Sequence, residues 1–179
     1  MANFNLKDVN VRIARADDFR KIMIFRHELG EELLKMNFPP VAEIGQQWMV
    51  AERGKEIVGV CAVQEDSRFR ATDPKSGEIF YAVRKDMRGG GVAKKLVREM
   101  FKNCRELGFR SIYGKPRPSL SREACERVRR EVGFGSYTPE RGWEKIFKPR
   151  GNVSKFFRNA ARRIRKLKPG RKKSPIRRR

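Results

Sequence analysis

The sequence predicts an α/β fold built on a mixed β-sheet, with helices between its strands. Two observations support this prediction. Short runs rich in β-branched residues recur along the chain, and longer segments with apolar residues at helical spacing separate them. Their order is strand, helix, three strands, helix, strand, helix and two strands, with a short helix or turn left open before the second strand.

The first strand and the first helix lie close to the N-terminus. Residues 9–16 alternate as a strand does, and Asp17 and Asp18 stand where a helix N-cap is expected. Apolar residues then recur at helical spacing over 19–36. The other strands are predicted at 46–52, 57–64, 78–83, 109–114, 134–137 and 142–147.

Two further helices are predicted in the second half of the chain. The clearer one follows Gly91, carries one apolar stripe and ends at Gly108. The other is predicted over 122–132, with Ser121 as its cap and the Gly133-Phe134 pair at its end.

Charge divides the chain into two parts. The formal net charge is +23, and residues 148–179 hold 15 of the 44 basic side chains and no acidic one. We therefore predict a folded domain over 1–147, with a net charge of +8, and a separate basic tail over 148–179.

The tail is expected to contain a basic amphipathic helix followed by a disordered end. Three interpretations remain open: binding to nucleic-acid phosphates, binding to an anionic membrane surface through Phe156 and Phe157, or packing on the domain. No base-reading motif is visible, so any nucleic-acid contact is expected to lack sequence preference.

Several classes of site and location are excluded or disfavoured. No apolar run approaches the roughly 20 residues of a membrane span, and no cleavable leader is visible, so a cytoplasmic location is expected. Three cysteines without ligand spacing fit a reducing compartment. The only histidine, His27, rules out a Ser-His-Asp triad, and no metal site is predicted.

A basic, glycine-rich turn links the strand at 78–83 to the helix after Gly91. Arg88 is followed by three glycines, and Lys94 and Lys95 lie in the first helical turn. Glycines at a helix start allow a close backbone approach, and the free amides attract anions such as phosphate. The spacing fits neither a P-loop nor a dinucleotide-binding fingerprint. A plain glycine turn is the alternative.

The pattern Arg88-x-x-Gly91-x-Ala93 resembles the coenzyme A loop of the GNAT superfamily of N-acetyltransferases. The order of elements over residues 10–147 and the Gly133-Phe134 junction are also similar. The resemblance implies a sheet splayed at its centre, between the strands at 78–83 and 109–114, with acetyl-CoA as cosubstrate. The coenzyme-binding residues that it implies are Val83, Arg88, Gly89, Gly90, Gly91, Val92, Ala93 and Lys94.

The catalytic residues depart from the pattern of the family. Many members of the family have a tyrosine in the helix predicted here at 122–132, where it serves as the acid for the thiolate; the corresponding residue in this chain is Arg129. An asparagine often found near the start of the same helix corresponds to Arg122. Arginine does not release a proton at ordinary pH but can stabilise a thiolate. The alternative places both arginines on a solvated helix face. The candidate catalytic residues are therefore Glu78 as base, Arg129 as an electrostatic substitute, and Tyr137 as acid, with Tyr113 as its rival.

The function expected from the resemblance is acyl-CoA-dependent N-acyl transfer, with acetyl as the expected group, to an unidentified amine. The alternative is a non-catalytic scaffold of the same fold whose tail binds nucleic acid or an anionic surface. Whether the chain forms a homodimer is left open.

Overall fold

The computed structural model of the chain describes residues 5–30, 47–66, 75–115, 122–135, 137–139 and 141–147. Its strands are β1 (Val9–Ile13), β2 (Trp48–Arg53), β3 (Glu56–Glu65), β4 (Ser76–Val83), β5 (Ser111–Gly114), β6 (Tyr137–Thr138) and β7 (Gly142–Ile146). Its α-helices are α1 (Phe19–Leu29), α3 (Val92–Glu106) and α4 (Arg122–Val132). The tail over 148–179 lies outside the described residues.

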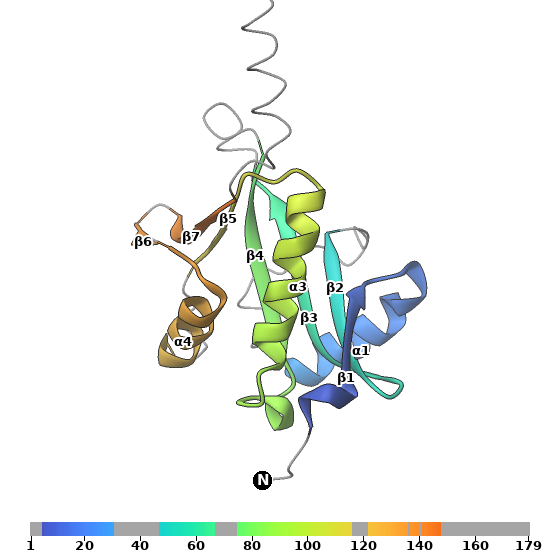
Figure 1. The fold of residues 1–179 in the computed structure, drawn as a ribbon. Helices are drawn as coiled ribbons and strands as arrows, with labels where there is room; N and C mark the ends of the chain where they lie inside the picture. The colour runs from blue at the N-terminus through green and yellow to red at the C-terminus, as the bar shows by residue number, and fades with distance from the viewer. Residues whose placement is uncertain are drawn as a thin grey trace, which may run out of the picture. The chain divides into compact units, whose positions relative to one another are not determined.

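The seven strands form one sheet in the order β1-β2-β3-β4-β5-β7-β6 (Figure 1). Only β4 and β5 are paired in parallel; the other neighbours are antiparallel. The predicted mixed α/β sheet is thus confirmed. The parallel pair needs a crossover between its strands, and α3 provides it.

The sheet splays at its centre, between β4 and β5. On one side, β4 pairs with β3 over the whole stretch from Gly77 to Val83. On the other side, it pairs with β5 only as far as Glu78 and Tyr113, and the two strands then diverge (Figure 1). The rest of β4 therefore has an unpaired edge in the middle of the sheet.

Helices cover the two faces of the sheet. One apolar cluster joins α3 to the sheet and includes Ile79, Val83, Leu96 and Met100. A second cluster joins α1 to the opposite face and includes Ile22, Phe25, Phe80 and Ala82. Because side chains alternate along a strand, the odd-numbered residues of β4 face α3 and the even-numbered ones face α1.

The first helix is shorter than the sequence pattern indicated. α1 ends at Leu29, because Gly30 takes a φ of 53°, which terminates the helix. Residues 31–36 of the predicted helix lie outside the described residues. Asp18 is the N-cap residue of α1, but its side chain makes no capping hydrogen bond.

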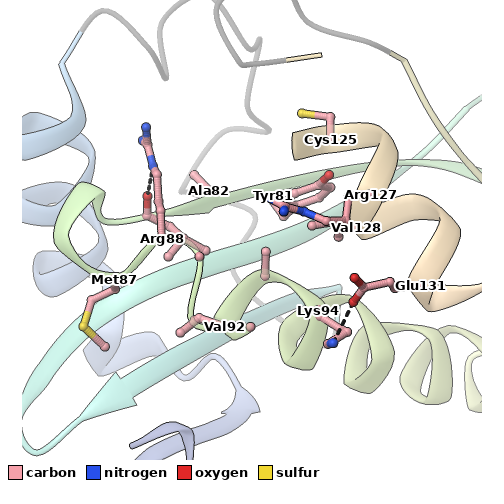
Figure 2. A pocket seen from close by; sticks show the side chains of 14 residues that line it. Tyr81, Ala82, Met87, Arg88, Val92, Lys94, Cys125, Arg127, Val128 and Glu131 are labelled. Carbon is pink, nitrogen blue, oxygen red and sulfur yellow. Dashed lines mark hydrogen bonds and ion pairs between the residues drawn. The ribbon is translucent and has the colours of Figure 1, made fainter. Parts of the chain in front are cut away.

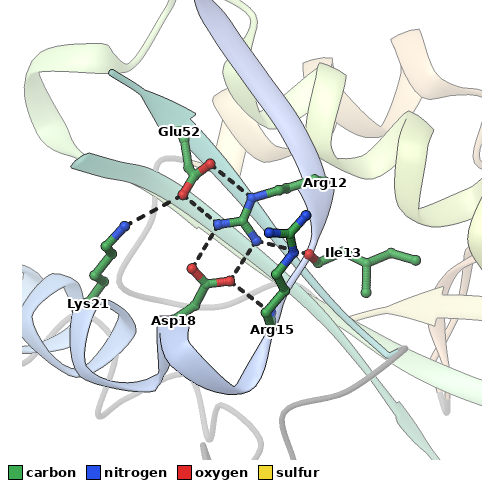
Figure 3. Close-up of polar contacts among 6 residues, drawn as sticks. All are labelled: Arg12, Ile13, Arg15, Asp18, Lys21 and Glu52. Atoms are coloured by element: carbon green, nitrogen blue, oxygen red, sulfur yellow. Dashed lines mark hydrogen bonds and ion pairs between the residues drawn. The ribbon is translucent and has the colours of Figure 1, made fainter. Parts of the chain in front are cut away.

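Asp18 is instead part of a polar network that ties α1 to the sheet (Figure 3). Arg12 on β1 donates to both carboxylate oxygens of Asp18, at 2.6 and 2.7 Å, and to Glu52 on β2 at 2.6 and 2.9 Å. The hydrogen bonds from Arg12 lower the pKa of Asp18 below its usual range. The network therefore fixes the start of α1 against the β1–β2 edge.

None of the helices in the described part of the chain has the length and apolar composition that a membrane span requires.

Candidate functional site

A cavity of about 330 Å³ lies at the end of β4, beside the start of α3 and under α4 (Figure 2). β4 contributes Tyr81, Ala82 and Val83. The turn and the start of α3 contribute Met87, Arg88, Gly89, Gly91, Val92, Ala93 and Lys94. α4 contributes Cys125, Arg127, Val128 and Glu131. All the predicted coenzyme-binding residues except Gly90 therefore line one cavity.

Two of the three glycines are needed for the backbone of the turn. Gly89 and Gly91 have φ values of 82° and 86°, which other residues rarely adopt. A Cβ atom added at Gly89 would meet no atom within 4 Å, whereas one at Gly91 would lie 3.3 Å from Leu6. The missing side chain at Gly89 thus leaves open space at the cavity wall.

The start of α3 presents unpaired amides to this space. Gly91 is the N-cap residue and has no side chain that could accept from the first amides. The first helical bond runs from the amide of Lys95 to the carbonyl of Gly91, at 3.0 Å. The amides of Val92, Ala93 and Lys94 precede it and have no partner within the helix. Such a helix start favours an anion.

Arg88 connects the turn to the end of β4. Its side chain is exposed, and Nε donates to the carbonyl oxygen of Val83 at 3.0 Å (Figure 2). The Val83 carbonyl therefore points toward the open edge of β4 rather than toward β3. The amide of Arg84, by contrast, donates to Val58 on β3 at 3.0 Å. Because backbone groups alternate along a strand, those of Tyr81 and Val83 face the splay.

An ion pair joins α3 to α4 at the cavity. Lys94 Nζ lies 2.6 Å from Glu131 Oε2, and both side chains are partly exposed (Figure 2). The hydrogen bond from Lys94 lowers the pKa of Glu131. The sequence pattern had indicated Lys94 but gave no sign of this partner, 37 residues further along the chain.

Arg129 is not on a solvated helix face, so that alternative interpretation is wrong for this residue. The residue is 4% exposed, and one guanidinium nitrogen donates to the carbonyl of Lys115 at 2.8 Å. No carboxylate forms an ion pair with it among the described residues. The positive charge of Arg129 acts to lower the pKa of Tyr81 and that of Cys125, which both line the cavity. The side chain of Arg122 lies outside the described residues.

The other predicted catalytic residues lie apart from one another. Glu78 is half-buried at the last pair of β4 with β5, on the face of the sheet opposite Tyr81. Tyr137 is 52% exposed on the edge strand β6, where it packs edge-on against Trp143. Tyr113 is fully buried and its hydroxyl bonds to Asp66. Neither Tyr137 nor Tyr113 lines the cavity.

Sequence reasoning missed Tyr81 and Cys125. The hydroxyl of Tyr81 is buried and has no hydrogen-bond partner among the described residues. Burial raises the pKa of Tyr81 and also that of Cys125. A tyrosine two residues before Val83, on the same face of β4, was the available signal, but it stood inside an apolar run.

Comparison with known proteins gives one family. A sequence model of the acetyltransferase (GNAT) family matches residues 15–134, about two thirds of the chain. A search of curated protein sequences found no significant match.

Solved structures share the fold at low sequence identity. An acetyltransferase of the GNAT family from Streptococcus pneumoniae has a TM-score of 0.62 and 16% identity, covering 78% of this chain and 99% of its own. The GNAT domain of PAT from S. lividans has a TM-score of 0.61 and 17% identity, covering 81% and 100%. A GNAT superfamily phosphinothricin acetyltransferase from Sinorhizobium meliloti, solved in complex with acetyl-CoA, has a TM-score of 0.55 and 19% identity, covering 78% and 85%.

Proposed function

Because the chain belongs to the GNAT family of acetyltransferases, we propose that it transfers the acetyl group of acetyl-CoA to an amine and binds this coenzyme in the cavity at the end of β4. The observation that carries the proposal is the divergence of β4 from β5 beside an uncapped helix start. Diverging strands leave backbone groups with which an extended ligand can pair, and the helix start offers amides to phosphates.

The phosphate end of the coenzyme fits the turn after β4. The amides of Val92, Ala93 and Lys94 supply donors, and Gly89 leaves the space open. Arg88 and Lys94 add positive charge near that space. The relative from S. meliloti was solved with acetyl-CoA, which supports the same ligand here.

The extended arm of the coenzyme fits the open edge of β4. The backbone groups of Tyr81 and the amide of Val83 face the splay and are proposed to pair with the arm's amides, whereas the Val83 carbonyl accepts from Arg88. In this arrangement the amide of Val83 is the proposed donor to the acetyl carbonyl, where negative charge develops as the amine attacks.

Acetyl-CoA supplies the thioester that the amine attacks. Glu78 lies where β4 and β5 diverge, on the α1 face, and is the proposed base for an amine that approaches from that side. Arg129, buried near Tyr81, is the proposed positive charge that stabilises the departing thiolate.

The charge of residues 148–179 supports a second, separate proposal. This segment carries 15 basic and no acidic side chains, so it is proposed to bind nucleic acid through its phosphates. A scaffold that binds coenzyme without turning it over remains the alternative to the enzyme.

Coenzyme binding is tested by two glycine variants, each at a position with a positive φ. Gly89 and Gly54 both have positive φ, at 82° and 61°, and an added Cβ meets no atom within 4 Å at either position. Only Gly89 lines the cavity; Gly54 lies in the hairpin between β2 and β3. Calorimetry with acetyl-CoA should show that Gly89→Ala loses about tenfold in affinity, equal to about 1.4 kcal/mol, whereas Gly54→Ala binds as the wild type does.

If the wild type and both variants are folded and bind acetyl-CoA with equal affinity, the turn is not part of the binding site. Turnover is measured separately, as thiol release from acetyl-CoA with a panel of small-molecule, peptide and nucleobase amines. Tight coenzyme binding without turnover on any of these acceptors would favour the scaffold.

A further inference from the structure

The hydroxyl of Tyr81 is a buried polar atom in the wall of the coenzyme cavity. Only two buried side-chain oxygens in the described part of the chain have no hydrogen-bond partner, Tyr81 Oη and Ser76 Oγ, and of these two residues only Tyr81 lines the cavity. A buried hydroxyl without a partner destabilises a fold, and phenylalanine would fill the same space without that penalty. The hydroxyl is therefore best explained by a bond to a ligand.

The surroundings of Tyr81 keep its proton in place until a strong acceptor arrives. Its ring extends from β4 toward α4 (Figure 2). Burial raises its pKa, as does the nearby Cys125 thiol, so the phenol is protonated at neutral pH. The nearby Cys125 thiol is a weak hydrogen-bond partner, and the Tyr81 hydroxyl forms no full hydrogen bond with it.

The other polar side chains that line the cavity are poor proton donors. Lys94 is paired with Glu131, and that pairing lowers the pKa of Glu131, which is therefore ionised. Arg127 does not release a proton at ordinary pH. The thiol of Cys125 is a weak hydrogen-bond donor, which leaves the hydroxyl of Tyr81 as the strongest neutral donor among these side chains.

We propose that the Tyr81 hydroxyl contacts the sulfur of the coenzyme and protonates it as it leaves, a role that rests on the function proposed above. The amine nitrogen forms a bond to the thioester carbon, the carbon–sulfur bond breaks, and its electron pair stays on sulfur. The phenolic proton passes to that sulfur. Glu78, the proposed base, takes the proton lost by the nitrogen, and water carries that proton on to the phenolate, so Glu78 and Tyr81 are both regenerated.

Arg129 favours this proton transfer. Its guanidinium is buried, it forms no ion pair among the described residues, and its charge lowers the pKa of Tyr81 against the effect of burial. The same positive charge stabilises the transient phenolate. Arg129 therefore has a positioning and electrostatic role, and Tyr81 is the residue that touches the reacting atom.

The contact with sulfur is tested by comparing coenzyme A with desulfo-coenzyme A, which lacks the thiol. The wild type should bind coenzyme A more tightly than the desulfo analogue, and Tyr81→Phe should lower that affinity ratio by roughly threefold or more. With an accepting amine, Tyr81→Phe should lower kcat by about 100-fold and leave KM for acetyl-CoA within about twofold.

Tyr113→Phe is the matched control. It also removes a buried tyrosine hydroxyl, but that hydroxyl bonds to Asp66, and Tyr113 does not line the cavity. Its affinity ratio for the two ligands should equal that of the wild type. Thermal melting adds a second readout, because Tyr81→Phe should melt at or above the wild-type temperature and Tyr113→Phe below it.

The outcomes separate the inference from the function on which it rests. If the wild type binds neither ligand, the proposed function fails and this inference with it. If the wild type binds both and Tyr81→Phe keeps the wild-type ratio, only the inference is overturned. The inference is likewise overturned if Tyr81→Phe melts well below the wild type, or if Tyr137→Phe changes the ratio instead.

Discussion

At the scale of single residues, Arg12 on β1 joins the start of the first helix to the neighbouring strand β2. It holds Asp18 at the start of α1 and Glu52 on β2 at the same time (Figure 3). The carboxylate of Asp18 is almost fully buried and also accepts the amide of Arg15 at 2.8 Å. A buried carboxylate with three donors contributes stability only while it is ionised.

This contribution has a defined dependence on pH. The pKa of Asp18 is lowered in the folded chain, so its stabilisation is complete above the unfolded value of about 3.9 and is lost as the pH falls below it. Asp18→Asn should lower the free energy of unfolding by about 2 kcal/mol at pH 7. The difference from the wild type should shrink at pH 3.

Urea unfolding of the wild type and of Asp18→Asn measures the difference in their free energies of unfolding at pH 7 and at pH 3. The exposed neighbour provides the control, since Asp17→Asn should leave the free energy of unfolding within about 0.5 kcal/mol of the wild type at either pH. A difference for Asp18→Asn that stays constant between the two pH values would contradict the proposed ionic contribution.

At the scale of elements, the ion pair between α3 and α4 places a carboxylate beside the proposed phosphate site. Glu131 lies at the cavity and holds Lys94 at 2.6 Å. The coenzyme carries several negative charges, and like charges repel. Glu131→Gln removes this repulsion and releases Lys94, so acetyl-CoA affinity should rise by about threefold at low salt. The gain should diminish as salt is added.

A second ion pair on α3 supplies the control for this measurement. Glu99 and Lys102 also lie 2.6 Å apart, but neither lines the cavity. Glu99→Gln should leave the affinity for acetyl-CoA unchanged in calorimetry. Weaker binding by Glu131→Gln would mean that Glu131 holds Lys94 in its binding position, and the repulsion argument would then be wrong.

At the scale of the whole molecule, the basic excess is concentrated outside the GNAT domain. Residues 148–179 are expected to bind duplex DNA through about 6 to 10 phosphates, which gives a slope of log affinity against log salt of roughly −5 to −9. Fluorescence anisotropy with duplexes of different sequence measures this slope, and sequence should matter little.

Truncation after Phe147 separates the tail from the domain. The shortened chain should lose DNA binding and keep its affinity for acetyl-CoA. An unchanged salt slope in the truncated chain would locate the DNA contact on the domain instead. Binding of the full chain to anionic vesicles but not to DNA, with dependence on Phe156 and Phe157, would indicate a membrane surface as the partner.

The sequence by itself determined the order of the elements and the place of the glycine-rich turn between β4 and α3. Both depend on local signals, which are the spacing of apolar residues and the positive φ that Gly89 and Gly91 adopt. The end of α1 was missed, although Gly30 carried a local signal for it. The central splay followed from the family resemblance, and the pairing of β4 with β5 confirms it.

Only the tertiary structure decided the surroundings of the polar side chains on α4 and β4. Arg129 has the sequence pattern of a surface residue. In the structure this residue of α4 is buried, and it donates a hydrogen bond to the carbonyl of Lys115, just after the end of β5. Tyr81 stands in an apolar run, and its hydroxyl is buried without a partner in the wall of a cavity that α4 helps to line. Burial and partners depend on contacts between segments tens of residues apart, and the periodicity of a single segment carries no information about such contacts.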